Sequence, residues 1–179
     1  MKKIIVFLMI VCNVNLGSLH AMNAKNDVSQ ATETLKDSTR LAELDSYWAN
    51  ISKTVKEGDF EGYKTLYHKD AIVVFTYGDN AVSRPITEVL PGWKNGFNKT
   101  KEGRQIDEVE FRFSQRIGNE TTAHETGIFI FTSKSPDGAV KTKLIMHFEA
   151  LLTKKNNQWY MLMEYQKSEA SQEEWEALK

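Results

Sequence analysis

The pattern of hydrophobic and polar positions changes from helical spacing in the first half of the chain to strand-like alternation in the second. Between about Arg104 and Ser168, four runs carry alternating, β-branched or aromatic residues and are separated by short polar turns. Short connections join antiparallel neighbours, so the pattern predicts a four-stranded antiparallel meander. Its strands are expected at Ile106–Ile117, Thr121–Ser133, Val140–Thr153 and Gln158–Lys167.

Three turn sequences set the register of this meander. Gly118-Asn119 suits a two-residue hairpin, and Asn156-Asn157 tolerates the positive φ of a type I′ turn. Ser135-Pro136-Asp137-Gly138 suits a type I turn closed by a glycine bulge, because proline fits its second position. These turns predict which side chains share a face of the sheet.

In this register, Phe113 lies opposite His124. The later turns then place Ala150 opposite His124, and Met163 opposite Ala150. One face is apolar apart from His124, and it contains Phe111, Phe113, Ile128, Leu144, Met146, Phe148, Ala150, Met161, Met163 and Tyr165.

The opposite face mixes charged and apolar side chains. Glu125, Glu149 and Glu164 form a cross-strand row there, and such a row of like charges is unfavourable. A slip of one residue in the second strand would exchange His124 and Glu125 between the faces. Glu125 would then be an isolated carboxylate in an apolar pocket, with a raised pKa. The apolar residues of this face are Phe129, Phe131, Ile145, Leu151 and Leu162.

Helical spacing precedes the meander. An apolar stripe with three- and four-residue steps predicts an amphipathic helix that starts near Asp37 or Ser38 and ends at Gly58. Asp59 can cap a second, short helix that extends to about Tyr67. The stripe consists of Leu41, Leu44, Trp48, Ile51 and Val55.

Two further elements are expected before the meander. Ala71–Thr76 has the composition of a short buried strand, and Tyr77–Pro85 that of a polar loop. A third helix is expected around Ile86–Lys101, with Pro91 as a point where it could break. Helices with one short strand, followed by antiparallel strands, indicate an α+β domain.

The first residues are typical of a secretory signal peptide. A basic start, a short apolar run and a small residue at Ala21 predict a signal peptide over residues 1–21 and a secreted or periplasmic protein. The apolar run is too short to span a membrane, so no membrane association is expected after cleavage. The single cysteine, Cys12, lies in this segment. Lipidation there is the alternative, but bulky Val11 precedes the cysteine.

Composition fits one globular domain with extensions at both ends. The chain has 179 residues, of which 41% are hydrophobic and 26% charged. Residues 22–36 predict a flexible tether, residues 37–168 the folded domain, and residues 169–179 a charged tail. Removal of Lys2 and Lys3 takes the net charge from −1 to −3, which gives no reason to expect nucleic acid as a partner.

Four short motifs follow one another in order: Lys56–Phe60, Leu66–Ile72, Ala123–Gly127 and Asn156–Met161. From about Thr39 to Lys167, the chain resembles the SnoaL-like branch of the nuclear transport factor 2-like superfamily. The resemblance implies a cone-shaped α+β fold, in which three N-terminal helices pack on a bent antiparallel sheet of four to five strands. It also implies a pocket between helices and sheet, and dimers formed through the sheets. Members include isomerases, dehydratases and cyclases, so the fold does not decide the function.

The leading functional hypothesis is an exported domain that binds a small apolar or aromatic molecule in this pocket. The predicted ligand-binding residues are Trp48, Tyr63, Phe113, Met146, Phe148 and Met163. The alternatives are an isomerase, dehydratase or cyclase acting on a carbonyl compound, and a dimeric interaction module. No cofactor is predicted.

In the enzymatic alternative, His124 is the general base, and Tyr165 or Tyr67 donates a hydrogen bond to the substrate. The structural alternative for His124 is a core histidine bonded to a backbone carbonyl or a tyrosine. The resemblance to ketosteroid isomerase would require two acids beside a tyrosine, and the sequence shows no convincing match. Where many SnoaL-like relatives carry histidines, this chain has Met163 and Tyr165.

The outer face of the sheet suggests two further roles. His147, Glu149 and Glu164 are of a type that binds metal ions, but they lack ligand spacing, so no metal site is predicted. The apolar residues of that face predict a two-fold homodimer in which the face meets its own copy. If the protein is monomeric, the tether or the tail is expected to cover this face.

Overall fold

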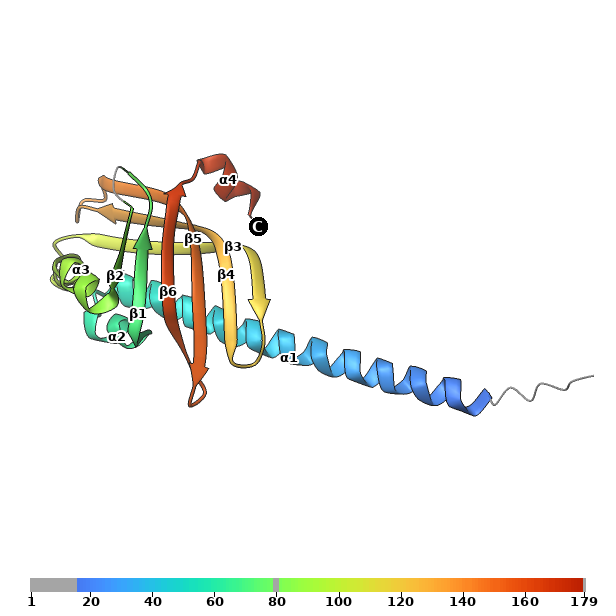
Figure 1. The fold of residues 1–179 in the computed structure, drawn as a ribbon. Helices are drawn as coiled ribbons and strands as arrows, with labels where there is room; N and C mark the ends of the chain where they lie inside the picture. Colours follow the sequence, from blue (N-terminus) through green and yellow to red (C-terminus); the bar gives the residue numbers. More distant parts are fainter. Residues whose placement is uncertain (1–15, 79–80, 179) are drawn as a thin grey trace, which may run out of the picture. The chain divides into compact units, whose positions relative to one another are not determined.

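The computed structural model describes residues 16–78 and 81–178 (Figure 1). The chain divides into two units, Met1–Leu35 and Lys36–Lys179, and the second unit contains all of the strands. The first fifteen residues of the predicted signal peptide lie outside the described part, so that assignment remains a prediction. Within the described residues, no helix has both the length and the apolar character that crossing a membrane requires.

The first helix, α1 (Leu16–Glu57), begins well before Asp37 and Ser38, so neither of these residues starts it. Residues 22–36, which the composition predicts as a tether, are helical. No glycine or proline occurs between Ser18 and Glu57, so nothing in this stretch interrupts helix propagation. The second unit nevertheless starts at Lys36, close to the predicted domain boundary.

A six-stranded mixed sheet forms the centre of the second unit (Figure 1). Its strand order is β2-β1-β6-β5-β4-β3; β1 runs parallel to β6, and all other neighbours are antiparallel. The α+β class is confirmed, although the sheet is mixed and larger than predicted. The strands are β1 (Tyr67–Phe75), β2 (Val82–Pro85), β3 (Ile106–Gly118), β4 (Thr122–Lys134), β5 (Val140–Lys155) and β6 (Gln158–Glu169).

Three shorter helices complete this unit. They are α2 (Phe60–Thr65), α3 (Ile86–Lys101), which Pro91 does not break, and α4 (Gln172–Ala177). Gly58 separates α1 from α2 with a φ of +65°, and the Asp59 side chain caps α2 by accepting a hydrogen bond from the Gly62 N–H. The end of α1 at Gly58 and the start of α2 at Asp59 were therefore predictable from residue type.

One face of the sheet, here called the inner face, packs against the apolar stripe of α1. Trp48 contacts Phe111, Phe113 and Phe148, with ring centroids 4.6 to 5.5 Å apart. Leu44, Trp48, Ile51 and Val55 are buried as the stripe predicts, and Leu41 is half-buried. The opposite face is called the outer face.

The register of the meander differs from the prediction, although two turns form as expected. Asn156 and Asn157 both have positive φ, and Gly138 follows a turn in which its N–H donates to the Ser135 carbonyl. The loop of the first hairpin is longer than the predicted two residues, Gly118-Asn119, because Gly118 is still paired, with Ala123. A bulge at Ser114 shifts the pairing by one further residue, so Phe113 lies opposite Gly127 instead of His124.

β-Bulges within the strands cause the other differences. Next to the second turn, Lys134 pairs with Val140, as the turn chemistry requires. The pairing then shifts by one residue, so Ser133 pairs with Thr142 and Lys141 is the extra residue. A shift of one residue exchanges the two faces of a strand. The slipped alternative is therefore the observed one: Glu125 lies on the inner face and His124 on the outer face.

A second bulge has the same effect on β6. Leu152 pairs with Met161, whereas Leu151 pairs with Met163 and Ala150 with Glu164. This shift places Glu164 on the inner face and moves Met163 and Tyr165 to the outer face. The predicted pairing of Ala150 with His124 is wrong because of the Lys141 bulge, and that of Ala150 with Met163 is wrong because of the bulge in β6.

Candidate functional site

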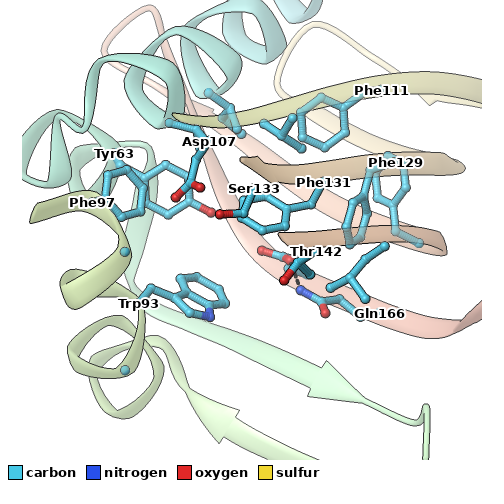
Figure 2. Close-up of a pocket in the computed structure, with 18 of the residues that line it drawn as sticks. Tyr63, Trp93, Phe97, Asp107, Phe111, Phe129, Phe131, Ser133, Thr142 and Gln166 are labelled. Atoms are coloured by element: carbon cyan, nitrogen blue, oxygen red, sulfur yellow. Dashed lines mark hydrogen bonds between the residues drawn. The ribbon is translucent and has the colours of Figure 1, made fainter. Parts of the chain in front are cut away.

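A cavity of about 420 Å³ lies between the inner face of the sheet, the end of α1, and helices α2 and α3 (Figure 2). Its volume is in the range of small-molecule sites. Aromatic rings form most of its wall. They are Trp48, Tyr63, Tyr67, Phe75, Tyr77, Trp93, Phe97, Phe111, Phe129, Phe131 and Phe148.

Glu164 supplies the first acidic group of the cavity, from the middle of β6. Its Oε2 accepts a hydrogen bond of 2.5 Å from the Tyr67 hydroxyl, and its Oε1 accepts one of 2.6 Å from the Gln166 amide. The Tyr67 hydroxyl also lies 2.9 Å from that of Tyr63. Burial raises the pKa of the Glu164 carboxyl, and the two hydrogen bonds oppose this effect only in part.

Asp107 supplies the second acidic group, from the start of β3 (Figure 2). It is only 5% exposed. Its Oδ2 accepts a hydrogen bond of 2.6 Å from Gln105, but its Oδ1 has no hydrogen-bond partner among the described residues. A buried carboxylate oxygen without a partner is costly, so Asp107 is suited to meet a group that the protein itself does not provide.

The remaining polar groups around the cavity are neutral. They include Gln105, Ser133, Thr142 and Gln166. No lysine, arginine or histidine occurs among the described residues that line the cavity. Two carboxyl groups in an aromatic surrounding thus make this cavity acidic and poorly hydrated.

The structure brings four of the predicted site residues to the cavity. Trp48, Tyr63 and Phe148 line it, as does Tyr67. Burial and the neighbouring Glu164 raise the pKa of Tyr67 well above its ordinary value, so its hydroxyl remains protonated and able to donate.

The other predicted residues lie elsewhere. His124 is on the outer face, where its Nε2 lies 3.3 Å from Glu149 Oε2, and it has no access to the cavity. Tyr165 is on the same face and accepts a hydrogen bond of 3.3 Å from the Thr76 hydroxyl. His124 as a base and Tyr165 as a donor are therefore excluded from chemistry in this cavity.

Three predicted ligand-binding residues also fall outside the cavity lining. Phe113 is on the inner face but packs against Trp48 and Phe148. Met146 is 1% exposed and belongs to the hydrophobic core. Met163 is on the outer face, because the β6 bulge reverses its direction.

Glu125, the alternative pocket carboxylate, is buried without reaching the cavity. One of its oxygens accepts a hydrogen bond from the Trp48 indole N–H, and the other accepts one of 2.6 Å from Arg116 Nε. Arg116 also pairs with Asp45 of α1. This network joins α1 to the β3–β4 hairpin, so the role of Glu125 is structural.

The three outer-face residues considered for a metal do not come together. Glu164 lines the cavity, His147 Nε2 lies 3.3 Å from Glu174, and Glu149 pairs with Lys167 at 2.6 Å. Among the residues that the structure describes, no group of three His, Cys, Asp or Glu side chains is arranged to hold a metal ion.

Comparison with known proteins agrees with this architecture. The family model of the SnoaL-like domain matches residues 44–168. The chain belongs to the SnoaL-like family. A search of curated proteins found no match.

Solved structures of SnoaL-like and related proteins share the fold at low sequence identity. A nuclear transport factor 2-like protein of unknown function from Shewanella oneidensis is 14% identical, with a TM-score of 0.56 over 73% of this chain and 99% of that one. A ketosteroid isomerase-like protein from Erwinia carotovora atroseptica is 16% identical, with a TM-score of 0.51 over 73% of this chain and 96% of that one. Identities this low show the fold and leave the activity open.

Sequence reasoning missed the two acids of the SnoaL-like cavity. Asp107 lies at the start of a strand whose alternation is clear, so its face could have been assigned from Val109 and Phe111. Glu164 could not be assigned in the same way, since the bulge before it reverses the alternation. Two acids and a tyrosine, Asp107, Glu164 and Tyr67, therefore line one cavity, a combination that the predicted register did not bring together.

Proposed function

We propose that this domain binds a small apolar or aromatic molecule in the cavity between its helices and its sheet. The observation that carries the proposal is the cavity of about 420 Å³, walled by aromatic rings and containing a few polar groups. Ligand sites are usually lined in this way, because apolar walls provide affinity and a few polar groups fix orientation.

A side chain that fills the cavity tests the proposal. Gly96 of α3 lines the cavity, and a Cβ added there would meet no atom closer than 3.6 Å. Gly96→Leu is therefore expected to occupy ligand space without disturbing the backbone. We expect it to weaken binding of a simple aromatic probe, 2-phenylethanol, at least tenfold by calorimetry.

The matched control is Asn95→Leu, on the adjacent exposed position of α3. It adds the same side chain outside the cavity and should leave binding unchanged. Equal binding by the Gly96→Leu variant and the unmodified full chain would contradict the proposal.

A second candidate is a cofactor-independent isomerase, dehydratase or cyclase that acts on a carbonyl compound. The specific observation in its favour is the presence of Asp107, Glu164 and Tyr67 around one cavity. The Asp107 carboxylate would accept a proton, and the Glu164 carboxyl, protonated, would donate to the Tyr67 hydroxyl and so free that hydroxyl to donate to the substrate oxygen. Deuterium exchange next to the carbonyl of 2-tetralone, followed by NMR, tests for such proton transfer; exchange at the buffer rate would remove this candidate.

The third role, a homodimer formed through the outer face, rests on a different set of residues from those first expected. Phe129 and Phe131 line the cavity and cannot contribute.

A further inference from the structure

All ionisable groups on the cavity wall are acidic or phenolic. Asp107 and Glu164 are the carboxyl groups, and no basic side chain accompanies them among the described lining residues. Glu125, the other buried acid among the described residues, has a basic partner: it is paired with Arg116 at 2.6 Å. Arg116 thus compensates the charge of the structural Glu125, whereas no basic side chain among the described lining residues compensates Asp107 or Glu164.

The aromatic rings beside these acids are arranged around the same space. Tyr63 contacts both Trp93 and Phe97, with ring centroids 6.0 and 4.9 Å away, and all three rings line the same cavity as Asp107 (Figure 2). The face of an aromatic ring carries negative electrostatic potential, and it attracts a cation within about 6 Å of its centroid.

We propose that the ligand of this cavity is an organic cation, an ammonium group carried on an apolar or aromatic body. This inference rests on the proposed binding function and specifies the chemical class of the ligand. The ammonium group would lie against the carboxylate of Asp107, a lining residue whose Oδ1 has no hydrogen-bond partner among the described residues. The body of the ligand would contact Phe111, Phe129 and Phe148, further along the cavity.

Charge distinguishes an ammonium ligand from an anionic ligand and from a neutral alcohol of similar shape. An anionic ligand would add a third negative group to a cavity that offers no positive one, and its charge would be desolvated without compensation. A neutral alcohol could donate one hydrogen bond to Asp107, but it would leave the carboxylate charge uncompensated. An ammonium group provides both the hydrogen bond and the charge.

Three probes with the same phenyl ring separate these possibilities. They are 2-phenylethylammonium, 2-phenylethanol and phenylacetate, and binding to the full chain is measured by calorimetry at neutral pH. We expect the ammonium probe to bind at least tenfold more tightly than the alcohol, and phenylacetate to bind most weakly of the three.

A variant locates the origin of the preference. Asp107→Asn keeps the shape of the side chain and removes its charge, so the ammonium probe should lose most of its advantage while the alcohol binds as before. Binding of the alcohol also shows that the variant is folded. Asp70→Asn, an exposed position of β1 outside the cavity, is the matched control and should retain the full preference.

The binding results distinguish failure of the cation inference from failure of the proposed binding function. If the alcohol binds as tightly as the ammonium probe, or phenylacetate binds most tightly, the cation inference is wrong while the binding function stands. If none of the three probes binds at millimolar concentration, both are wrong. An unchanged preference in the Asp107→Asn variant would likewise overturn the inference.

Discussion

At the scale of single residues, Glu164 shows how a cavity changes the chemistry of an ordinary side chain. Burial disfavours its charged form, so its pKa in the folded protein lies above that in the unfolded chain. Between these two pKa values, the folded state holds more protons on this group than the unfolded state does. The contribution of Glu164 to the free energy of unfolding therefore decreases as pH rises between these two pKa values, and it stays low at higher pH.

This sign gives a direct prediction for Glu164→Gln, which removes the titration. Relative to the unmodified protein, the variant should gain stability as pH is raised from about 4 to about 8, because only the unmodified protein must ionise a buried acid. Denaturant unfolding at both pH values measures the difference. Glu149→Gln, on the outer face, is the control; the pKa of Glu149 is lowered by Lys167, so its pH dependence should have the opposite sign.

At the scale of elements, Gly58 determines how α1 leads into α2. Its φ is +65°, and a Cβ at this position would meet the Lys101 backbone nitrogen of α3 at 2.4 Å. Both the positive φ and the close approach of α3 therefore disfavour any side chain at position 58.

Gly58→Ala should therefore lower the free energy of unfolding by roughly 1–3 kcal/mol, measured by denaturant titration. Gly92→Ala is the matched control, because a Cβ at Gly92 of α3 meets nothing within 4 Å. That change should stabilise the protein by up to about 1 kcal/mol, since alanine is the better helix former. Equal effects of the two substitutions would show that Gly58 is not constrained as described.

At the scale of the whole molecule, one row of side chains crosses five strands of the outer face and is apolar except for His124. Register partners run from Ile72 of β1 through Met163, Leu151 and His124 to Ile117 of β3. Ile72, Leu151 and Ile117 are 40%, 38% and 51% exposed. Exposed apolar side chains on adjoining strands favour association, and a second copy of the same face is the simplest partner.

Part of the outer face is already covered by its own chain. The C-terminal helix α4 lies next to Arg112, whose Nη1 donates hydrogen bonds of 2.9 Å to the carbonyls of Trp175 and Leu178. Arg112 also stacks on the Trp175 ring at 4.4 Å. The tail thus covers one region of this face, as the sequence suggested for a monomer, and leaves the row around Leu151 exposed.

If the outer faces form the proposed dimer, Leu151→Glu, at the centre of this row, should make the protein monomeric, as measured by light scattering at tens of micromolar. Val140→Glu places the same charge on the same strand, at a 59% exposed position outside the row, and should not change the mass. A monomeric unmodified chain at that concentration would contradict the dimer.

The sequence by itself determined the fold family, helices α2 and α3 and the four strands of the meander, but not β2 or the helical conformation of residues 22–36. Those features depend on local causes: the apolar spacing around Trp48, the cap at Asp59, the positive-φ residues Asn156 and Asn157. The turn chemistry even fixed the register beside each of the last two turns. Each of these structural features depends on residues that lie within a few positions of it in the sequence.

Only the tertiary structure decided which side chains enter the cavity. A bulge at Lys141 and another at Leu162 each add one residue to a strand, and each reverses the faces beyond it. No local residue pattern marks these two positions; a bulge forms where bending lets the sheet pack against α1 and close around the cavity. The shifts placed His124 on the outer face and put Glu164 in the cavity in place of Met163, so the described lining contains a second acid beside Asp107 and no histidine.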